Sequence, residues 1–155
     1  MNSAPAQCRW ARKDVVIVGA GPIGIEAAIL AKRAGLDLLL LDKGAVVDAI
    51  RRYPVYMTFF TSSDRLEVGG HPLVTATDKP TRKEALDYYR KVVQNEQLPL
   101  LTYTQVTSLQ AQPQGGFEVH TRATPPSGPQ PVTQVIQARH VVVATGYFDN
   151  PKPLG

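Results

Sequence analysis

One six-residue segment limits the possible folds of this chain more than any other. It spans residues 19–24, reads GAGPIG and matches the pattern G-x-G-x-x-G. The β-branched run before it, residues 15–18, predicts a strand buried on both faces, as in a parallel sheet. The following segment is rich in alanine and isoleucine and predicts a helix to about Ala34, with Gly35 as its C-cap glycine. Residues 38–41 predict a second strand, which completes a right-handed βαβ unit.

The spacing of the three glycines has a mechanical cause. The first glycine permits the turn from strand to helix, the second lets the backbone approach a pyrophosphate, and the third lets the helix pack closely on the strand. The helix N-terminus then supplies N–H groups and the positive end of the helix dipole. A purely structural glycine turn is the alternative interpretation. The residues predicted to form this phosphate-binding turn are Gly19, Ala20, Gly21, Pro22, Ile23 and Gly24.

An acidic residue follows the second predicted strand at a suitable distance. Asp42 stands eighteen residues beyond Gly24. A carboxylate at this place accepts hydrogen bonds from a ribose 2′-hydroxyl and disfavours a 2′-phosphate. The sequence therefore predicts that this site binds FAD or NAD and not NADP.

The middle and the second half of the chain predict a helix followed by strands. Residues 46–52 predict a short helix and residues 57–70 a loop. A capping box at residues 81–84 opens a longer helix, on which Leu86, Tyr89 and Val93 form an apolar stripe. A Pro- and Gly-rich stretch at residues 123–131 predicts a hairpin loop. Five strands are predicted at residues 100–104, 106–111, 117–122, 132–137 and 141–145.

This order of elements separates FAD from NAD. An NAD dehydrogenase continues with further βα units, whereas a helix, an antiparallel meander and a last apolar strand are typical of glutathione-reductase-like FAD domains. That last strand runs into Ala144, Thr145 and Gly146, whose small side chains let backbone pass close to a ligand. We predict an α/β fold: an incomplete Rossmann-like FAD-binding domain with a parallel sheet and an antiparallel β-meander crossover.

Length and composition exclude several classes of protein. A chain of 155 residues corresponds to one domain, so it has no room for two complete nucleotide-binding domains. Its 17 basic and 13 acidic residues are scattered, which argues against a nucleic-acid-binding tail. Cys8 is the only cysteine, so no internal disulfide, Cys-x-x-Cys pair or zinc site is expected. No signal peptide or membrane span is predicted, and we expect a cytoplasmic protein without a bound metal.

Several segments together resemble a known family, the YpdA-type bacillithiol disulfide reductases, which are flavoproteins related to thioredoxin reductase. The resemblance covers nearly the whole chain from Asp14. The segments at residues 58–63 and 144–151 are the more discriminating, because all such flavoproteins share the glycine motif. The segments are residues 14–22, 42–44, 53–54, 87–90, 58–63 (TFFTSS) and 144–151 (ATGYFDNP).

This resemblance implies an enzyme that binds FAD, takes hydride from NADPH and reduces the disulfide of a low-molecular-weight thiol. The glycine turn would hold the pyrophosphate, Asp42 with Lys43 would lie at the adenosine ribose, and the backbone of Val106 would meet the adenine. Residues 144–146 would lie close to the cofactor. No catalytic residue is assigned. Four residues would lie near the isoalloxazine, although they could equally form a packed loop: Phe59, Phe60, Thr61 and Ser62.

The chain departs from the family in two ways. Family members often carry cysteine at the position of Ile23, so thiol chemistry at that point is excluded in this chain. The chain also has no second glycine motif, so we expect residues 14–155 to be the N-terminal portion of an FAD domain, without its NADPH domain and preceded by a flexible extension at residues 1–13.

Three functions remain open at this stage. The first is the disulfide reductase, which in its full-length form could be a homo-oligomer. The second is a flavin monooxygenase, whose FAD domain begins in the same way. The third is a nucleotide-binding fragment without turnover of its own. We expect the isolated chain to bind FAD weakly at best and to oxidise no NADPH.

Overall fold

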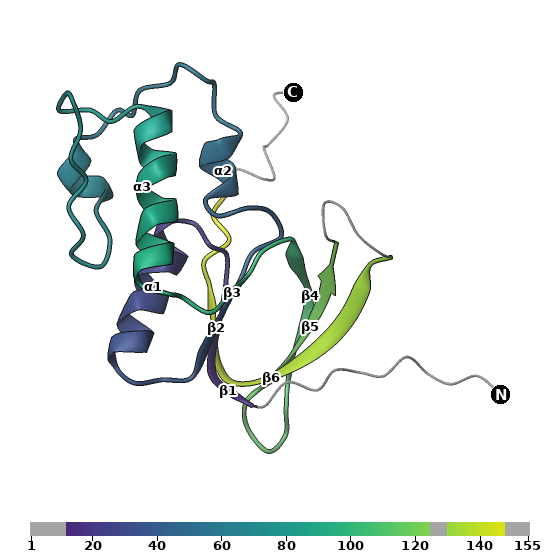
Figure 1. Ribbon diagram of the computed structural model, residues 1–155. Coiled ribbons are helices and arrows are strands. Elements are labelled where there is room, and N and C mark those ends of the chain that lie inside the picture. The colour runs from purple at the N-terminus through teal and green to yellow at the C-terminus, as the bar shows by residue number, and fades with distance from the viewer. Residues whose placement is uncertain (1–11, 125–129, 148–155) are drawn as a thin grey trace.

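The computed structural model describes residues 12–124 and 130–147 (Figure 1). The N-terminal βαβ unit is present as predicted, and Gly35 has the positive φ of +75° expected just after a helix. The elements in chain order are β1 (Lys13–Val18), α1 (Pro22–Arg33), β2 (Leu38–Leu41), α2 (Asp48–Arg51), the 3-10 helix η1 (Ser63–Leu66), α3 (Arg82–Asn95), β3 (Leu100–Leu101), β4 (Thr104–Ala111), β5 (Phe117–Ala123) and β6 (Val132–Val143).

All six strands belong to one sheet, in the order β3-β2-β1-β6-β5-β4. Strands β3, β2, β1 and β6 run parallel, and β6, β5 and β4 form an antiparallel meander. Figure 1 shows α1 and α3 on one side of the parallel part, with the meander curving away on the other side. The predicted combination of a parallel sheet with an antiparallel meander is therefore confirmed.

The two strands predicted at residues 132–137 and 141–145 are wrong as separate strands, because β6 is continuous. Its first half pairs antiparallel with β5 and its second half pairs parallel with β1. Ala138 is shared, since it pairs with both Phe117 and Lys13. The polar residues between the two apolar runs resemble a break in the sequence, but Arg139 and His140 are exposed, and Arg139 forms an ion pair of 3.4 Å with Asp14.

The strand predicted at residues 100–104 is also wrong, because it is divided between two elements. Strand β3 ends at Leu101, and Tyr103 has a φ of +52°, which interrupts extended backbone before β4 begins at Thr104. The predicted helix at 46–52 is shorter, since Val47 has a φ of +47° and α2 begins only at Asp48. The predicted loop at 57–70 contains η1.

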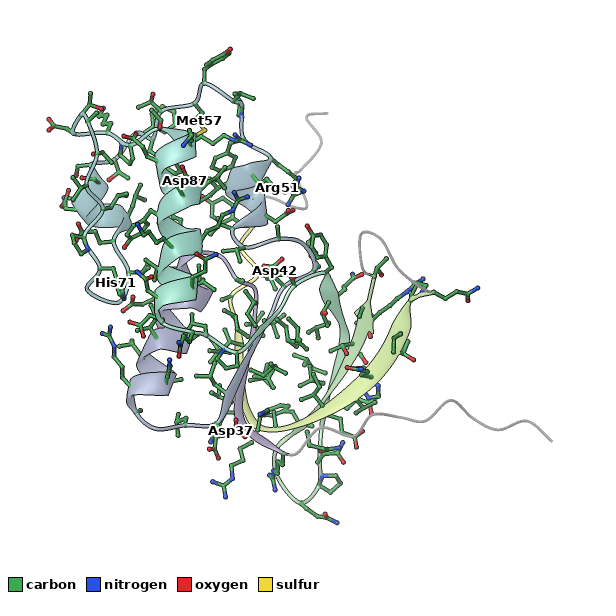
Figure 2. All side chains as sticks on the ribbon, in the orientation of Figure 1. Asp37, Asp42, Arg51, Met57, His71 and Asp87 are labelled. Atoms are coloured by element: carbon green, nitrogen blue, oxygen red, sulfur yellow. The ribbon has the colours of Figure 1, made fainter. Side chains whose placement is uncertain are left out.

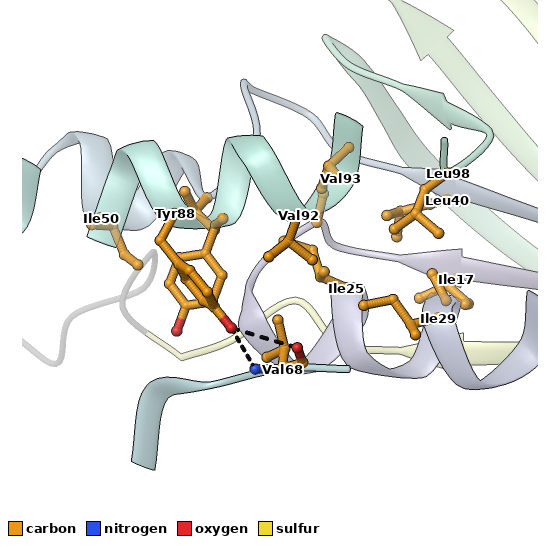
Figure 3. Close-up of a cluster of buried hydrophobic side chains, with 14 of the residues drawn as sticks. Ile17, Ile25, Ile29, Leu40, Ile50, Val68, Tyr88, Val92, Val93 and Leu98 are labelled. Carbon is orange, nitrogen blue, oxygen red and sulfur yellow. Dashed lines mark hydrogen bonds between the residues drawn. The ribbon is translucent and has the colours of Figure 1, made fainter. Parts of the chain in front are cut away.

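A hydrophobic core packs against each face of the sheet. The first lies between the sheet and helices α1 and α3, where Ile17, Ile25, Ile29 and Leu40 are fully buried (Figure 3). The predicted stripe of α3 packs into this core, with its tyrosine fully buried. The second core lies on the other face of the sheet, against the meander. It consists of Val16, Leu39, Leu41, Val119, Ile136 and Ala138.

The capping box of α3 is confirmed and allows a first prediction. The Thr81 hydroxyl accepts a hydrogen bond from Glu84 N at 3.2 Å, and the Glu84 carboxylate accepts one from Thr81 N at 2.8 Å. The bond from Thr81 N, together with one that the Thr81 hydroxyl donates to the same carboxylate at 2.8 Å, holds the pKa of Glu84 below its usual value. We expect Thr81→Ala to destabilise the chain by about 1 kcal/mol, which lowers the melting temperature by about 2–4 °C. Thermal unfolding followed by circular dichroism measures this, and Thr81→Ser should behave like the unmodified chain. Equal melting temperatures for T81A and T81S would contradict the capping role.

Candidate functional site

A cleft of about 800 Å³ opens at the carboxyl ends of β1, β2 and β6. In the strand order, β2 and β3 continue to one side of β1, whereas β6 lies on the other side. The cleft is therefore at a topological switch point, where open α/β sheets bind their ligands. Figure 2 shows Asp42 at this end of β2 and Asp37 at the opposite end.

Two of the three motif glycines are required by the packing of the protein itself. Gly19 has a φ of +109°, and a Cβ atom there would lie 2.3 Å from the carbonyl oxygen of Ala144. A Cβ atom at Gly24 would lie 1.8 Å from the carbonyl oxygen of Gly19. The first glycine thus permits contact between the β1 and β6 termini, and the third permits close packing of α1 on the turn.

The middle glycine differs from the other two. Gly21 has an ordinary extended conformation, with φ −78° and ψ 179°, and a Cβ atom there would meet no atom within 4 Å. Gly21 also lines the cleft. The fold therefore does not require glycine at this position, and its missing side chain leaves backbone open to whatever enters the cleft.

The N-terminus of α1 faces this space without a side-chain cap. Gly21 is its N-cap residue, Pro22 occupies its first position, and no acidic residue lies in its first turn. The first N–H groups of a helix have no partner within the helix, and they lie at the positive end of its dipole. Because α1 has 12 residues, this end is suited to an anionic group such as a phosphate.

Asp42 connects the two loops that flank the cleft. Its Oδ2 accepts a hydrogen bond from Ala20 N at 2.7 Å, and its Oδ1 accepts one from Gly44 N at 2.7 Å. The side chain is half-buried and lines the cleft. Its own carbonyl accepts from Thr104 N at 2.7 Å, which brings the start of β4 and Val106 into the same wall.

The other end of the cleft is apolar and aromatic. The rings of Tyr53 and Phe59 lie 6.2 Å apart between centroids, and Leu66 and Tyr89 also line this part. Burial raises the pKa of the Tyr89 hydroxyl far above its ordinary value, and this hydroxyl donates a hydrogen bond to the carbonyl of Leu66 at 2.8 Å. Burial and the nearby Tyr147 raise the pKa of Tyr53. Both phenols are therefore neutral at physiological pH and do not supply a charged acid or base.

Most of the predicted site residues meet in this cleft, but some do not. Ala20 and Gly24 of the glycine turn do not line the cleft, because Ala20 is fully buried and Gly24 packs against the backbone of Gly19. Phe60 is 91% exposed, and Thr61 and Ser62 are half-buried outside the cleft lining. The predicted residues that line the cleft are Gly19, Gly21, Pro22, Ile23, Asp42, Lys43, Phe59, Val106, Ala144, Thr145 and Gly146.

The structure adds lining residues that the sequence did not assign to the site. Tyr53 and Tyr147 fall in segments that carry the family resemblance, so the signal for them was present. Tyr89 was assigned to the core, where its body lies, although it also reaches the cleft. No motif marks the remaining ones. The additional residues include Asp48, Arg52, Tyr53, Leu66, Tyr89, Thr104, Gln105 and Tyr147.

Metal and thiol sites are absent from residues 12–124 and 130–147. Within these ranges, no three His, Cys, Asp or Glu side chains are grouped so that they could hold a metal ion. The same ranges contain no cysteine, and Ile23, which the resemblance places where family members often carry cysteine, is 73% exposed in the cleft. No helix in the described part of the chain is long and apolar enough to cross a membrane.

Comparisons with known proteins show the family to which the chain is related. The chain matches the family described as pyridine nucleotide-disulphide oxidoreductase over residues 16–155. Among curated relatives, it is 34% identical to bacilliredoxin reductase Bdr of Bacillus subtilis, over 93% of this chain and 41% of that protein. The resemblance to YpdA-type reductases is thereby confirmed.

Solved structures give the same result. The bacillithiol disulfide reductase Bdr (YpdA) of Bacillus cereus superposes with a TM-score of 0.86 at 36% identity, covering 93% of this chain and 43% of that one. The Staphylococcus aureus enzyme of the same name gives 0.78 at 36% identity, over 89% and 39%. A flavin monooxygenase mutant of Stenotrophomonas maltophilia gives 0.75 at 25% identity, over 88% and 38%. The chain thus spans about two fifths of the length of these relatives and has the fold of the part that it matches in each.

Proposed function

The chain belongs to the pyridine nucleotide-disulphide oxidoreductase family, and on this premise we propose that its cleft binds FAD for an NADPH-dependent disulfide reductase. One observation carries the proposal. An uncapped helix N-terminus and the unobstructed backbone of Gly21 face a cleft at the switch point of the sheet. This arrangement fits the pyrophosphate of a dinucleotide because it combines N–H donors, a positive dipole end and close backbone approach.

The residues of the cleft suggest a direction for the bound cofactor. The backbone at Gly21 and Ile23 would bind the pyrophosphate, and the Asp42 carboxylate would accept from the adenosine ribose. Val106 would lie against the adenine. Phe59 and the turn at residues 144–146 would border the flavin. A bound flavin can accept a hydride and pass the electron pair on to an acceptor. Phe60, Thr61 and Ser62 were also predicted to lie near the flavin, but their loop would have to rearrange before they could contact it.

We propose a thiol disulfide as the electron acceptor. In the balanced reaction, NADPH and one proton reduce the S–S bond to two thiols, and NADP⁺ is released. The relatives' names point to two acceptors, bacillithiol disulfide and bacilliredoxin, and we favour the small-molecule disulfide. Because the described residues contain no thiol and Ile23 replaces one, a mixed disulfide with residue 23 has no part in the proposal. A reductase of this kind would act in the reducing cytoplasm.

The isolated chain is expected to bind FAD weakly and to oxidise no NADPH. The hydride donor would bind outside residues 14–155, since the relatives are more than twice as long as their matched parts. We would mix the purified chain with FAD, NADPH and bacillithiol disulfide and follow NADPH absorbance, with B. subtilis Bdr as the active control. Sustained NADPH consumption by the chain alone would contradict the expectation that NADPH binds outside residues 14–155.

A chimeric enzyme tests the reductase function more directly. Residues 14–155 would replace the matching segment of B. subtilis Bdr, and flavin absorbance of the purified chimera would verify cofactor loading. We expect NADPH oxidation that depends on bacillithiol disulfide and continues without oxygen. A chimera that retains FAD but reduces neither bacillithiol disulfide nor bacilliredoxin would overturn the proposed acceptor class.

A flavin monooxygenase is the second candidate function, supported by the superposition on the Stenotrophomonas enzyme. Disulfide reduction by the chimera does not address this candidate, so the measurement is made on oxygen. A monooxygenase-type segment would make NADPH consumption depend on oxygen and yield an oxygenated substrate or hydrogen peroxide. The greater identity to the Bdr structures favours the reductase.

A further inference from the structure

Asp42 makes more contacts with the protein than a residue dedicated to a ribose requires. Both of its carboxylate oxygens are engaged by backbone donors, Ala20 N on Oδ2 and Gly44 N on Oδ1, each at 2.7 Å. The bond to Gly44 is local, spanning two residues, and is typical of an aspartate after a strand. The bond to Ala20 spans 22 residues and joins the glycine turn to the end of β2.

The surrounding backbone bonds show what this link joins. The N–H of Ala20 points to Asp42, and its carbonyl accepts from Val47 N at 3.0 Å. The carbonyl of Gly44 accepts from Tyr103 N at 3.0 Å. The glycine turn, the loop at residues 42–47 and the turn before β4 thus form one hydrogen-bonded frame around the cleft. Asp42 is the charged side chain at its centre.

We propose that Asp42 is a positioning residue, whose carboxylate fixes the glycine turn against the 42–47 loop before any ligand enters. This inference rests on the proposed function, because the turn it fixes is the proposed pyrophosphate site. Each carboxylate oxygen can accept two hydrogen bonds, so a ribose hydroxyl can still bind. The glycine turn is therefore already ordered before a dinucleotide binds.

The substitution Asp42→Asn is expected to break one of the two hydrogen bonds and keep the other. An amide has one acceptor oxygen and one NH₂ group, so it can satisfy only one of the two backbone donors. The local turn with Gly44 suits asparagine well, which leaves the NH₂ group opposite Ala20 N. We expect Asp42→Asn to release the glycine turn while leaving the strand and its local turn in place. Asp37→Asn is the matched control, since Asp37 precedes the same strand at its other end (Figure 2).

Amide hydrogen exchange of the ligand-free chain provides the first test. In D42N, we expect the Ala20 amide to exchange about tenfold faster or more, with a smaller change at Gly44 and none in D37N. In the unmodified chain, a scalar coupling through the hydrogen bond should connect Ala20 N with the Asp42 carboxyl carbon. This second measurement needs no variant and holds even if D42N fails to fold. Unchanged exchange at Ala20 in a folded D42N, or absence of the coupling, would overturn the proposal.

A nucleotide pair distinguishes positioning from ribose contact. We would measure the affinity of the unmodified chain, D42N and D37N for ADP and for 2′,3′-dideoxy-ADP, which lacks the ribose hydroxyls. A positioning role weakens dideoxy-ADP about tenfold in D42N, and ADP by at least the same factor, because ADP also loses its proposed ribose contact. A role confined to the ribose weakens ADP alone, and that result would refute the inference. If neither nucleotide binds the unmodified chain, the proposed function fails, and the exchange test still decides the role of Asp42.

Discussion

Replacing Gly24 by alanine is expected to remove a large share of the stability of the chain. The added Cβ atom would lie 1.8 Å from the carbonyl oxygen of Gly19, and both partners belong to backbone that no side-chain rotation can move. Relief requires α1 to move away from the turn, which opens the core beneath Ile25 and Ile29. Overpacking of a core costs about 1–3 kcal/mol, and because backbone must shift at this position, we expect about 3 kcal/mol or more. A domain has only about 5–15 kcal/mol of stability in total.

Urea unfolding followed by circular dichroism measures this effect. Gly21→Ala is the matched control, because it is the same change in the same turn, at a site with no atom within 4 Å and an ordinary φ. We expect G21A to unfold within about 0.5 kcal/mol of the unmodified chain. A G24A chain with an unchanged unfolding midpoint would show that the helix does not pack on the turn as described.

Gly21→Ala is expected to have its effect on ligand binding instead. Its Cβ atom would enter the cleft beside the first turn of α1, where the proposed pyrophosphate meets backbone N–H groups. A hydrogen bond to a charged group contributes about 1.5–3 kcal/mol, so loss of one weakens binding about 10- to 100-fold. Gly21→Val should weaken it further, because the side chain is larger and the extended backbone tolerates it.

The affinity for ADP, followed by calorimetry, tests this expectation on folded variants. Ile23→Ala is the control, since it removes exposed atoms from the same turn and adds none. We expect I23A to bind ADP within about threefold of the unmodified chain, a difference below about 1 kcal/mol. If G21A and G21V bind ADP as well as the unmodified chain does, the dinucleotide does not approach the backbone at Gly21.

The βαβ unit could be predicted from the sequence because its signals are local. The glycine spacing, the buried runs on either side and Gly35 each depend on neighbouring residues only, and the structure agrees with all of them. The capping box of α3 is local for the same reason. The sequence does not predict that packing requires glycine at position 19 but not at position 21. The Ala144 carbonyl that crowds Gly19 lies more than a hundred residues along the chain.

Other features depend on contacts that no local pattern encodes. The continuity of β6 follows from pairing with β5 in one half and with β1 in the other, so its polar centre does not end it. Phe59 lines the cleft while the adjacent Phe60 is exposed. The sequence does not reveal which of these two adjacent aromatic side chains faces inward.

The two proposed roles of Asp42 illustrate the same limit. Its position after β2 predicts a ribose contact, because that position has a known relation to the dinucleotide. Its bond to Ala20 depends on the path of a turn 22 residues earlier and on the burial of that turn. The sequence therefore indicates the ribose contact of Asp42 but not its hydrogen bond with Ala20 N.

An NMR titration of the chain with FAD tests most directly whether this cleft binds a dinucleotide. The method detects weak binding and reports where the ligand lies through the shifts of individual backbone amides. We predict saturable shifts that are largest at residues 19–24, 42–44 and 104–106, the segments that meet at the mouth of the cleft. The absence of shifts up to millimolar FAD, or shifts confined to the outer face of the meander, would contradict the account.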